Sequence, residues 1–456
     1  MSQFEQAFLE SERKHILMIT NHGMHNWKYI PGLPDTGGQN VFVNQFTYTL
    51  ADLGYKITII NRGGYKHPVT GDMQQGLNYL DENQRVLYIE DSTKEFVRKE
   101  DMDEHIPELA DFLYEHLNTE NIPVDLIISH YWDSCKLAIM VNEKLDQPVK
   151  HIWVPHSLGE VKKRNMPEDT WEDLRIDERI ANEKTFRNKI DGVAATSALI
   201  RDSLESDYGY RDCLFLPPCV NAERFYQREV DDQHEIWNFL SQITGQSRDY
   251  VRECHIVAEI SRTDKTKRKD VLLKAFAEVR KKHPKAILVL AVDDSAEKVA
   301  PELHQLIDEL RLKGHVAAIG NEWERLPYLY SIISLYCSPS VMEGFGMAVQ
   351  EAAATRAPIV GSNKIPFVTE YLLGDDIEII RSPDNEHKPL KLGEGAIVAE
   401  ADDIQGFAKA LQIYFDDAVL RKKSGECAYH ITVPQFTWKN MAKSFLESID
   451  MDIPNP

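Results

Sequence analysis

HIVAEIS at residues 255–261 begins a series of five short apolar runs in the second half of the chain. The other four are AILVLAV at 286–292, HVAAIG at 315–320, ISLYCSP at 333–339 and APIVGS at 357–362. Longer amphipathic stretches separate these runs. Alternation of this kind is typical of parallel α/β layering, in which a helix connects one strand to the next. The second half is therefore predicted to be a doubly wound α/β domain.

The first half of the chain repeats the same rhythm. A stretch with helical spacing, residues 40–53, follows the first of its apolar runs. The apolar runs themselves lie at 15–20, 56–61, 124–129, 151–155 and 192–196. Two doubly wound halves, facing each other across a cleft, are the simplest architecture for this pattern.

A proline pair separates the two halves. It lies in LPPCVNAERF at 216–225, where it forces an extended backbone and ends any helix. The polar segment that follows, 226–254, is predicted to be a helical insertion, and 436–449 is predicted to be a helix that packs back on the first half. We therefore expect a first domain over 1–217, a second over 218–434, and a C-terminal helical segment over 435–456.

Composition excludes several classes of protein. The 73 acidic and 52 basic side chains give the 456 residues a formal charge of −21, which argues against nucleic acid or an anionic membrane as a partner. The six cysteines show no CxxC pair and no zinc-ligand spacing, and they fit a reducing cytoplasm. No secretion signal and no membrane span is expected, because the N-terminus is polar and no long uncharged apolar window occurs. An anionic substrate must therefore be bound by locally gathered positive charge.

Two candidate sites follow strands of the first half, where doubly wound folds bind their ligands. The pair Gly37-Gly38 precedes a helical stretch, so its amides and the helix terminus could bind a phosphate or a sugar; a plain glycine turn is the alternative. Because the segment is not GxGxxG, a nicotinamide site is disfavoured. His156, directly after the run at 151–155, could bond a sugar hydroxyl or steady charge near a reacting carbon, or be purely structural. Lys162 could meet a phosphate.

Two more candidate sites follow strands of the second half. The basic cluster from Arg262 to Lys269 could hold a diphosphate leaving group, and a solvated helix start is the alternative. SPSVMEGFGMAVQEA at 338–352 carries Glu343 and Glu351 on either side of a glycine-rich turn that opens a helix. Amides of Gly344 to Met347 are expected to point toward a ligand, and the carboxylates suit recognition of sugar or ribose hydroxyls.

The string from Glu343 to Glu351 resembles the E-x7-E signature of retaining glycosyltransferases of family 4, which have the GT-B fold of two Rossmann-like domains. Arg262 and Lys267, five positions apart, match the basic pair with which that family binds the donor pyrophosphate. Three segments are similar to those of sucrose-phosphate synthases and sucrose synthases: PDTGGQNVFV at 34–43, FVRKED at 96–101 and PHSLGEVKK at 155–163. The resemblance covers nearly the full length, including PPCVN after residue 216 and FTW at 436–438.

The resemblance implies an acceptor-binding first domain, a nucleotide-sugar-binding second domain and a role for each segment. Glu351 would bind the donor ribose, Glu343 the donor sugar, and His156 would lie near the primary hydroxyl of that sugar. The catalytic residues implied are His156, Arg262, Lys267 and Glu343. The donor-binding residues implied are Gly38, Arg262, Lys267, Glu343, Gly344, Phe345, Gly346, Met347 and Glu351. The acceptor-binding residues implied are Gly37, Gln39, Lys99, Tyr131, Lys162 and Arg179.

The activity implied is transfer of a hexose, with retained configuration, from a nucleoside diphosphate sugar to a small sugar or sugar-phosphate acceptor. Glucose from UDP-glucose and a phosphorylated acceptor are the first expectation. No metal site and no cofactor is expected, with Mg²⁺ at most dispensable, because the basic pair can do the work of a metal and Asp293-Asp294 is no convincing DxD. The expected partners are these substrates, and a homo-oligomer is left open.

Three departures from the family pattern leave the acceptor and donor open. Glu178-Arg179 stands where some of the synthases have two basic residues, Met342 replaces a common aromatic, and 363–366 lacks a glycine pair. Mannosyl or glucosyl transfer to fructose phosphate, glycerate or phosphoglycerate is therefore an alternative. Further alternatives are a GT-B sugar phosphorylase, a nucleotide-sugar epimerase, a non-catalytic sugar-nucleotide sensor and, least favoured, a nicotinamide dehydrogenase.

Overall fold

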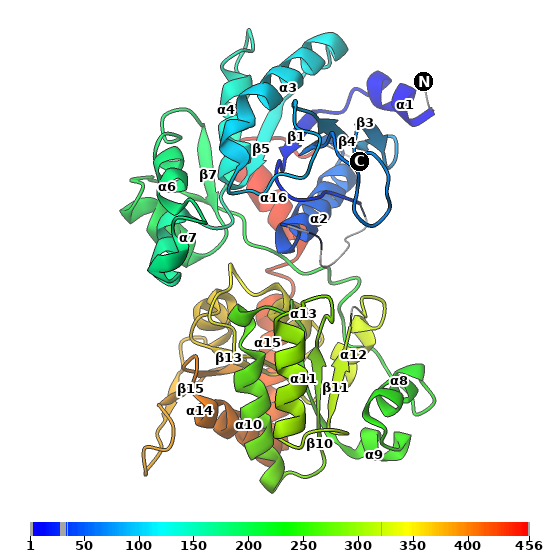
Figure 1. Ribbon diagram of the computed structural model, residues 1–456, viewed down its shortest axis with the longest axis vertical. Helices are drawn as coiled ribbons and strands as arrows, with labels where there is room; N and C mark the ends of the chain where they lie inside the picture. The colour runs from blue at the N-terminus through cyan, green and yellow to red at the C-terminus, as the bar shows by residue number, and fades with distance from the viewer. Residues whose placement is uncertain (1–2, 28–32, 34, 321, 455–456) are drawn as a thin grey trace. The chain divides into compact units, whose positions relative to one another are not determined.

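The computed structural model describes residues 3–27, 33, 35–320 and 322–454. Two compact units make up the chain: Met1–Pro217 together with Trp438–Pro456, and Pro218–Thr437. Within the described residues, each unit contains one eight-stranded, mostly parallel sheet covered by helices (Figure 1). The predicted fold class, two doubly wound α/β halves, is confirmed. Among the same residues, no helix has both the length and the apolar character needed to cross a bilayer.

The first sheet has the strand order β3-β4-β2-β1-β5-β6-β7-β8 and is parallel except for β3. The chain order reverses beside β1, whose neighbours are β2 and β5, and ligands of doubly wound sheets bind at such a point. The strands are β1 (His15–Ile19), β2 (Lys56–Arg62), β3 (Gly76–Tyr79), β4 (Gln84–Ile89), β5 (Leu126–His130), β6 (His151–Val154), β7 (Gly192–Ala195) and β8 (Leu214–Phe215).

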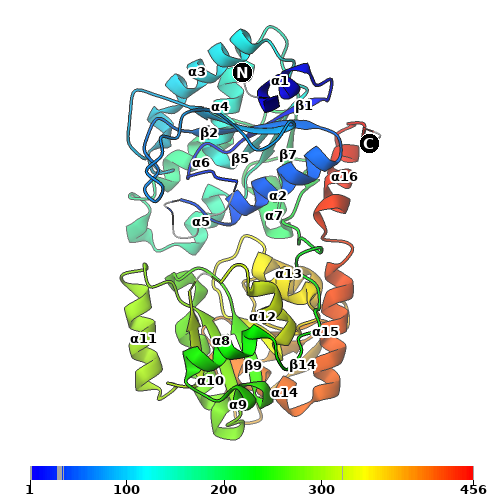
Figure 2. The same cartoon turned by 90° about the vertical axis from the view of Figure 1, so that its right-hand side faces the viewer.

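Helices cover both faces of the first sheet. α2 (Gly38–Asp52) and α16 (Trp438–Ser448) lie together on one face, and α3 (Ile106–Glu120) and α4 (Tyr131–Asn142) cover the other (Figures 1 and 2). α16 packs on α2 through Trp438, whose ring lies 4.9 Å from that of Phe42. The remaining helices of this unit are α1 (Gln3–Glu10), α5 (Gly159–Asn165), α6 (Ile176–Lys184) and α7 (Ala198–Ser206).

The second sheet has the order β11-β10-β9-β12-β13-β16-β15-β14, and its last two strands run antiparallel. Its order reverses beside β9, between β10 and β12, which again marks an expected ligand position. The strands are β9 (His255–Glu259), β10 (Ala286–Ala291), β11 (Val316–Ile319), β12 (Leu335–Ser338), β13 (Ile359–Ser362), β14 (Glu378–Ile380), β15 (Leu390–Leu392) and β16 (Ala396–Ala399). The helices are α8 (Glu235–Thr244), α9 (Arg248–Glu253), α10 (Lys269–Lys282), α11 (Val299–Glu309), α12 (Leu326–Ile332), α13 (Met347–Ala354), α14 (Ile404–Asp416) and α15 (Ala418–Thr432).

Candidate active site

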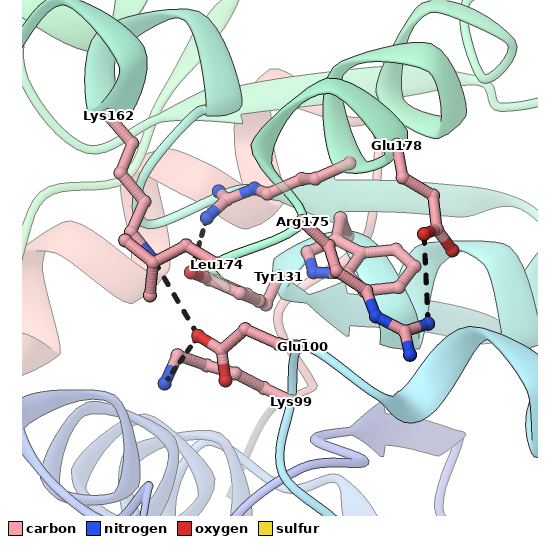
Figure 3. Close-up of a pocket in the computed structure, with 9 residues that line it drawn as sticks. Lys99, Glu100, Tyr131, Lys162, Leu174, Arg175 and Glu178 are labelled. Carbon is pink, nitrogen blue, oxygen red and sulfur yellow. Dashed lines mark hydrogen bonds and ion pairs between the residues drawn. The ribbon is translucent and has the colours of Figure 1, made fainter. Parts of the chain in front are cut away.

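Four of the predicted acceptor-binding residues line one pocket of the first unit. Lys99, Tyr131, Lys162 and Arg179 reach it from separate segments (Figure 3). The other lining residues are Glu100, Trp132, Leu174, Arg175 and Glu178. The pocket therefore combines four basic side chains with two carboxylates and an aromatic wall.

Arg179 is the most constrained of these cations. Its side chain is 4% exposed, and Nε donates to Glu183 Oε1 at 2.7 Å. The guanidinium also donates to the Tyr131 hydroxyl and to both the carbonyl and hydroxyl oxygens of Ser157, and these bonds use four of its five N–H groups. Burial opposes the charge, but Tyr131 and Glu183 outweigh it and raise the pKa of Arg179. Arg179 thus fixes Tyr131 and the backbone beside His156.

The two lysines of the pocket are held by carboxylates. Lys99 bonds Asp35 through both its backbone N–H and its ammonium group, and Glu100 Oε1 lies 3.2 Å from the ammonium. Burial lowers the pKa of Lys99, but Asp35 and Glu100 more than offset this and raise it. Lys162 lies 3.7 Å from the same oxygen of Glu100. Both lysines therefore have Glu100 as a partner inside the pocket.

Left-handed backbone conformations gather in this part of the first unit. Asp35, Tyr131, His156 and Arg175 have φ values of 50°, 76°, 55° and 43°, a region that residues with a Cβ rarely adopt. Such conformations cost about 1–3 kcal/mol each and tend to cluster where a site is pre-organised. All four residues line the pocket, pair with a lining lysine or adjoin the Arg179 contacts. The strain supports a functional role for the pocket.

His156 is held as a neutral imidazole. Its Nε2 lies 2.8 Å from Nδ1 of His130, and its ring meets Phe42 edge to face. Burial, with a smaller contribution from His22, lowers the pKa of His156 to about 3. At neutral pH it can therefore exchange hydrogen bonds with a hydroxyl but carries no charge. A neutral ring is compatible with the predicted hydroxyl contact and also with the purely structural alternative.

The glycine pair caps α2. Gly37 is the residue before the helix, and its N–H donates to the Asn40 side chain at 3.0 Å. Among the described residues, none apart from its chain neighbours has an atom within 4 Å of a Cβ added to Gly37. Gln39 Nε2 donates to the Thr20 hydroxyl, which follows β1. Pro34, the first residue of the predicted segment, lies outside the described residues.

The basic residues from Arg262 to Lys269 in the second unit have different surroundings. Lys269 is buried and pairs with Glu259 at 2.8 Å, so it supports the sheet. Lys267 is 8% exposed, and its ammonium group donates to Glu343 Oε1 at 2.6 Å, which joins two predicted catalytic residues. Arg262 is 65% exposed and lies 3.5 Å from Asp264. Of the predicted pair, Arg262 is therefore the cation most open to an incoming diphosphate.

The loop before α13 is fixed from behind by aromatic rings. Phe345 is 2% exposed and lies within 6 Å of Phe367, Tyr371 and Phe436, ring centre to ring centre. Gly346 has φ 122°, and a Cβ there would lie 2.8 Å from Ile365 Cγ2, so only glycine fits. The first N–H groups of a helix such as α13 have no helical acceptor and can receive an anion. The Phe345 side chain is therefore occupied by its aromatic neighbours, and the donor contacts predicted for Phe345 and Gly346 could come only from their backbone.

Glu351 lies one turn into α13, beside the Tyr330 hydroxyl, which donates to it at 3.1 Å. Burial raises the pKa of this carboxyl to about 7, although Tyr330 and Arg224 act in the opposite direction. It is therefore half ionised near neutral pH. An ionised carboxylate accepts two hydroxyl bonds from a ribose, whereas the acid form loses part of that capacity.

Binding of a nucleoside diphosphate is accordingly expected to tighten about tenfold as the pH rises from about 6 to about 8, because Glu351 ionises over that range. The pKa of Glu351 in the folded protein lies above its ordinary value, so protonation of Glu351 favours the folded state. This contribution to the free energy of unfolding is lost as the pH rises through about 7. Calorimetric titration with UDP at several pH values measures the effect. Glu351→Gln should show a flatter profile, while titration of UDP itself is common to both proteins. Equal slopes would contradict the role of Glu351.

Three residues of the site were not among the candidates named from the sequence. His22 is 5% exposed, bonds Asp133 at 2.9 Å and meets the Tyr131 ring edge to face, but nothing in its spacing marks it. Arg175 lines the pocket and has a left-handed backbone, which its sequence does not indicate. Glu100 stands in the FVRKED segment, yet its position between two lysines depends on the fold. Among the described residues, no three metal-ligating side chains form a cluster.

A family model described as Glycosyltransferase Family 4 matches residues 36–224, and one described as Glycosyl transferases group 1 matches 252–430. The chain is 27% identical to mannosylfructose-phosphate synthase of Agrobacterium fabrum, over 97% of this chain and 92% of that protein. It is 24% identical to D-inositol 3-phosphate glycosyltransferase of Corynebacterium aurimucosum, over 93% and 94% of the two chains.

Among solved structures, sucrose-phosphate synthase from Thermosynechococcus elongatus superposes with a TM-score of 0.75 at 20% identity, covering 96% of this chain and 98% of that one. This likeness concerns the fold. The two family models together match well over half of the chain, with one model for each half of the sequence. The protein is therefore a glycosyltransferase of the GT-B fold, built from a Glycosyltransferase Family 4 domain and a Glycosyl transferases group 1 domain.

Proposed function

We propose that the enzyme transfers a hexose from a nucleoside diphosphate sugar to a small phosphorylated acceptor, with retained configuration at the transferred carbon. The first unit is assigned to the acceptor and the second to the donor. UDP-glucose is the first donor to test, and ADP- and GDP-hexoses are the alternatives. Two relatives support an acceptor of this class, because their names include a phosphate: mannosylfructose-phosphate synthase and D-inositol 3-phosphate glycosyltransferase.

The observation that carries the acceptor class is the pocket of Figure 3. Lys99, Lys162, Arg175 and Arg179 surround it in a chain whose formal charge is −21. An anion would be repelled by most of such a surface and attracted here. Charge-assisted hydrogen bonds from lysine to phosphate are among the stronger polar contacts that a protein makes.

The proposed reaction is a same-face displacement. The bond between the anomeric carbon and the diphosphate oxygen breaks, the acceptor oxygen bonds to that carbon on the same face, and a donor phosphate oxygen takes the acceptor proton. Arg262 and the amides before α13 stabilise the charge that grows on the diphosphate. Neutral His156 would bond a sugar hydroxyl, and Glu343, held by Lys267, would bond another.

A donor-by-acceptor matrix tests the proposal. UDP-, ADP- and GDP-hexoses are combined with fructose 6-phosphate, phosphoglycerate and glycerol phosphate, and with fructose and glycerate as matched acceptors without phosphate. We expect one phosphorylated acceptor to be preferred and, by NMR of the product, the donor configuration to be retained. Turnover should persist in excess EDTA because Arg262 and Lys267 can neutralise the diphosphate.

Three outcomes would contradict the proposal. Equal use of fructose and fructose 6-phosphate would refute the acceptor class, and an inverted product would refute the mechanism. Loss of all turnover in EDTA would show that a metal does what is assigned to Arg262. An additional arm with inorganic phosphate and a disaccharide, assayed for sugar phosphate release, detects a phosphorylase instead.

A further inference from the structure

One side chain of the pocket in Figure 3, Glu100, is a carboxylate that lies beside two lysines. Glu100 is 7% exposed, and its Oε1 lies between the ammonium groups of Lys99 and Lys162, at 3.2 and 3.7 Å. Figure 3 shows its carboxylate pointing toward both lysines. A carboxylate in this position already makes the contacts that an acceptor phosphate would make.

The other cations of the pocket have closer partners. Arg179 has Glu183 at 2.7 Å, and Arg175 has Asp101 at 3.2 Å as well as two more distant carboxylates. Lys99 is bonded to Asp35 besides Glu100. Over the part of the chain that the structure describes, Glu100 is the sole carboxylate within ion-pair distance of Lys162, at 3.7 Å. Lys162 is therefore the cation that an incoming anion can capture most easily.

Electrostatics sets the consequence of this arrangement. A phosphate bonded to Lys162 would lie within a few ångströms of the Glu100 carboxylate, and like charges at such separations repel strongly where water is partly excluded. Binding must therefore exchange one anion for the other rather than add a second. A neutral acceptor offers no charge to take over Lys162 and leaves the Glu100 pairs intact.

We propose that Glu100 is an exchangeable counter-ion that sets the affinity of the acceptor pocket for phosphate. In the free enzyme it pairs with Lys99 and Lys162, and the phosphate of the acceptor replaces it on Lys162. Glu100 thereby weakens the binding of every phosphate-bearing ligand, including the phosphorylated product and free phosphate. The assignment rests on the proposed function, because it presumes a phosphorylated acceptor.

Glu100→Gln tests the assignment, since glutamine keeps the shape of the side chain and removes its charge. Calorimetric titration of the full-length protein with inorganic phosphate should give a Kd about tenfold lower than in the wild type, as expected for removing one nearby like charge. The KM of the preferred phosphorylated acceptor should fall to a similar extent, and that of its unphosphorylated counterpart should not change. If Glu100 served only to hold the lysines in place, the Kd would rise, which would overturn the assignment.

Glu104→Gln is the matched control. Glu104 is 77% exposed, lies 3.6 Å from Arg175 and is not among the residues that line the pocket. Glu104→Gln removes one negative charge close to the pocket but in exposed, screened surroundings. The phosphate Kd of this variant should therefore stay within about twofold of the wild-type value. Equal tightening in both variants would overturn the assignment, because total charge would then explain the effect.

The two proposals fail in different ways. Wild-type turnover without preference for a phosphorylated acceptor would refute the proposed function. Wild-type preference for a phosphorylated acceptor, combined with unchanged or weaker phosphate binding in Glu100→Gln, would overturn the role of Glu100 alone. Because phosphate binding is measured directly, a variant without turnover is still informative.

Discussion

Arg262→Ala is expected to lower kcat by about 10²–10³-fold, the usual loss when one fixed donor to a developing negative charge is removed. Arg262 is 65% exposed and lies 3.5 Å from the carboxylate of Asp264, so its charge is available to a leaving diphosphate. The same exposure means that the fold gains little from it. Turnover is measured at saturating donor and acceptor, and thermal unfolding is followed by circular dichroism. We expect the unfolding midpoint to stay unchanged.

Lys265→Ala supplies the control for Arg262. Lys265 belongs to the same basic cluster, is 75% exposed and lies 3.9 Å from Glu302, but the resemblance assigns donor binding to Arg262 and Lys267 and not to Lys265. Its replacement removes an equal charge from the same segment. Near-normal turnover is expected from it, and a comparable loss in both variants would mean that general loop charge, rather than Arg262, supports the reaction.

Arg179→Met is expected to lower the free energy of unfolding by roughly 3–5 kcal/mol, as happens when one partner of a buried ion pair is removed. The side chain of Glu183 is 0% exposed and would be left with neutral donors, the Tyr208 hydroxyl and the Gly159 N–H. Urea titration measures the loss. The KM for the acceptor should rise as well, because Tyr131 and the Ser157 backbone lose the group that fixes them.

The double variant Arg179→Met, Glu183→Gln separates these two effects. Without the buried carboxylate, most of the lost stability should return, whereas the acceptor KM should stay raised. If the double variant recovered both stability and KM, Arg179 would be a purely structural residue. If stability did not return, the loss would stem from packing rather than from the unpaired charge of Glu183.

Much of the fold could be predicted because buried parallel strands leave a simple signal. The runs at 255–261 and 286–292 contain β9 and β10 almost residue for residue, since both faces of these strands are covered. Six strands of the described part of the chain are missing from the predicted runs: β3, β4, β8, β14, β15 and β16. β14 and β15 are three residues long and partly exposed at one end of the sheet, so neither an apolar run nor a clear alternation marks them. β4 and β16 are buried, but β4 begins with Gln84 and Arg85, which shortens its apolar run, and β16 is four residues long. Short edge strands depend on pairing with a neighbour, which sequence patterning does not report.

Site residues that belong to a short motif could be predicted from the sequence. Contacts between segments far apart in the sequence could not. Gly346 could be picked out from the sequence, because it is a glycine in a position where the backbone φ is positive. The grouping of Lys99, Lys162 and Arg179 followed from a resemblance, and nothing in their spacing predicts that they share a pocket. The pairing of Lys267 with Glu343, and of Glu100 with two lysines, needs the fold, because each joins residues from different segments.

The left-handed residues beside the pocket have a consequence for how this sequence can evolve. If each of the four costs about 1 kcal/mol, together they take a sizeable share of the 5–15 kcal/mol that stabilises a typical domain. Glycine at Asp35 or Arg175 would relieve the strain but remove the side chain that the site uses. The strain held beside the pocket therefore leaves the first unit of this protein less stability in reserve against destabilising substitutions elsewhere.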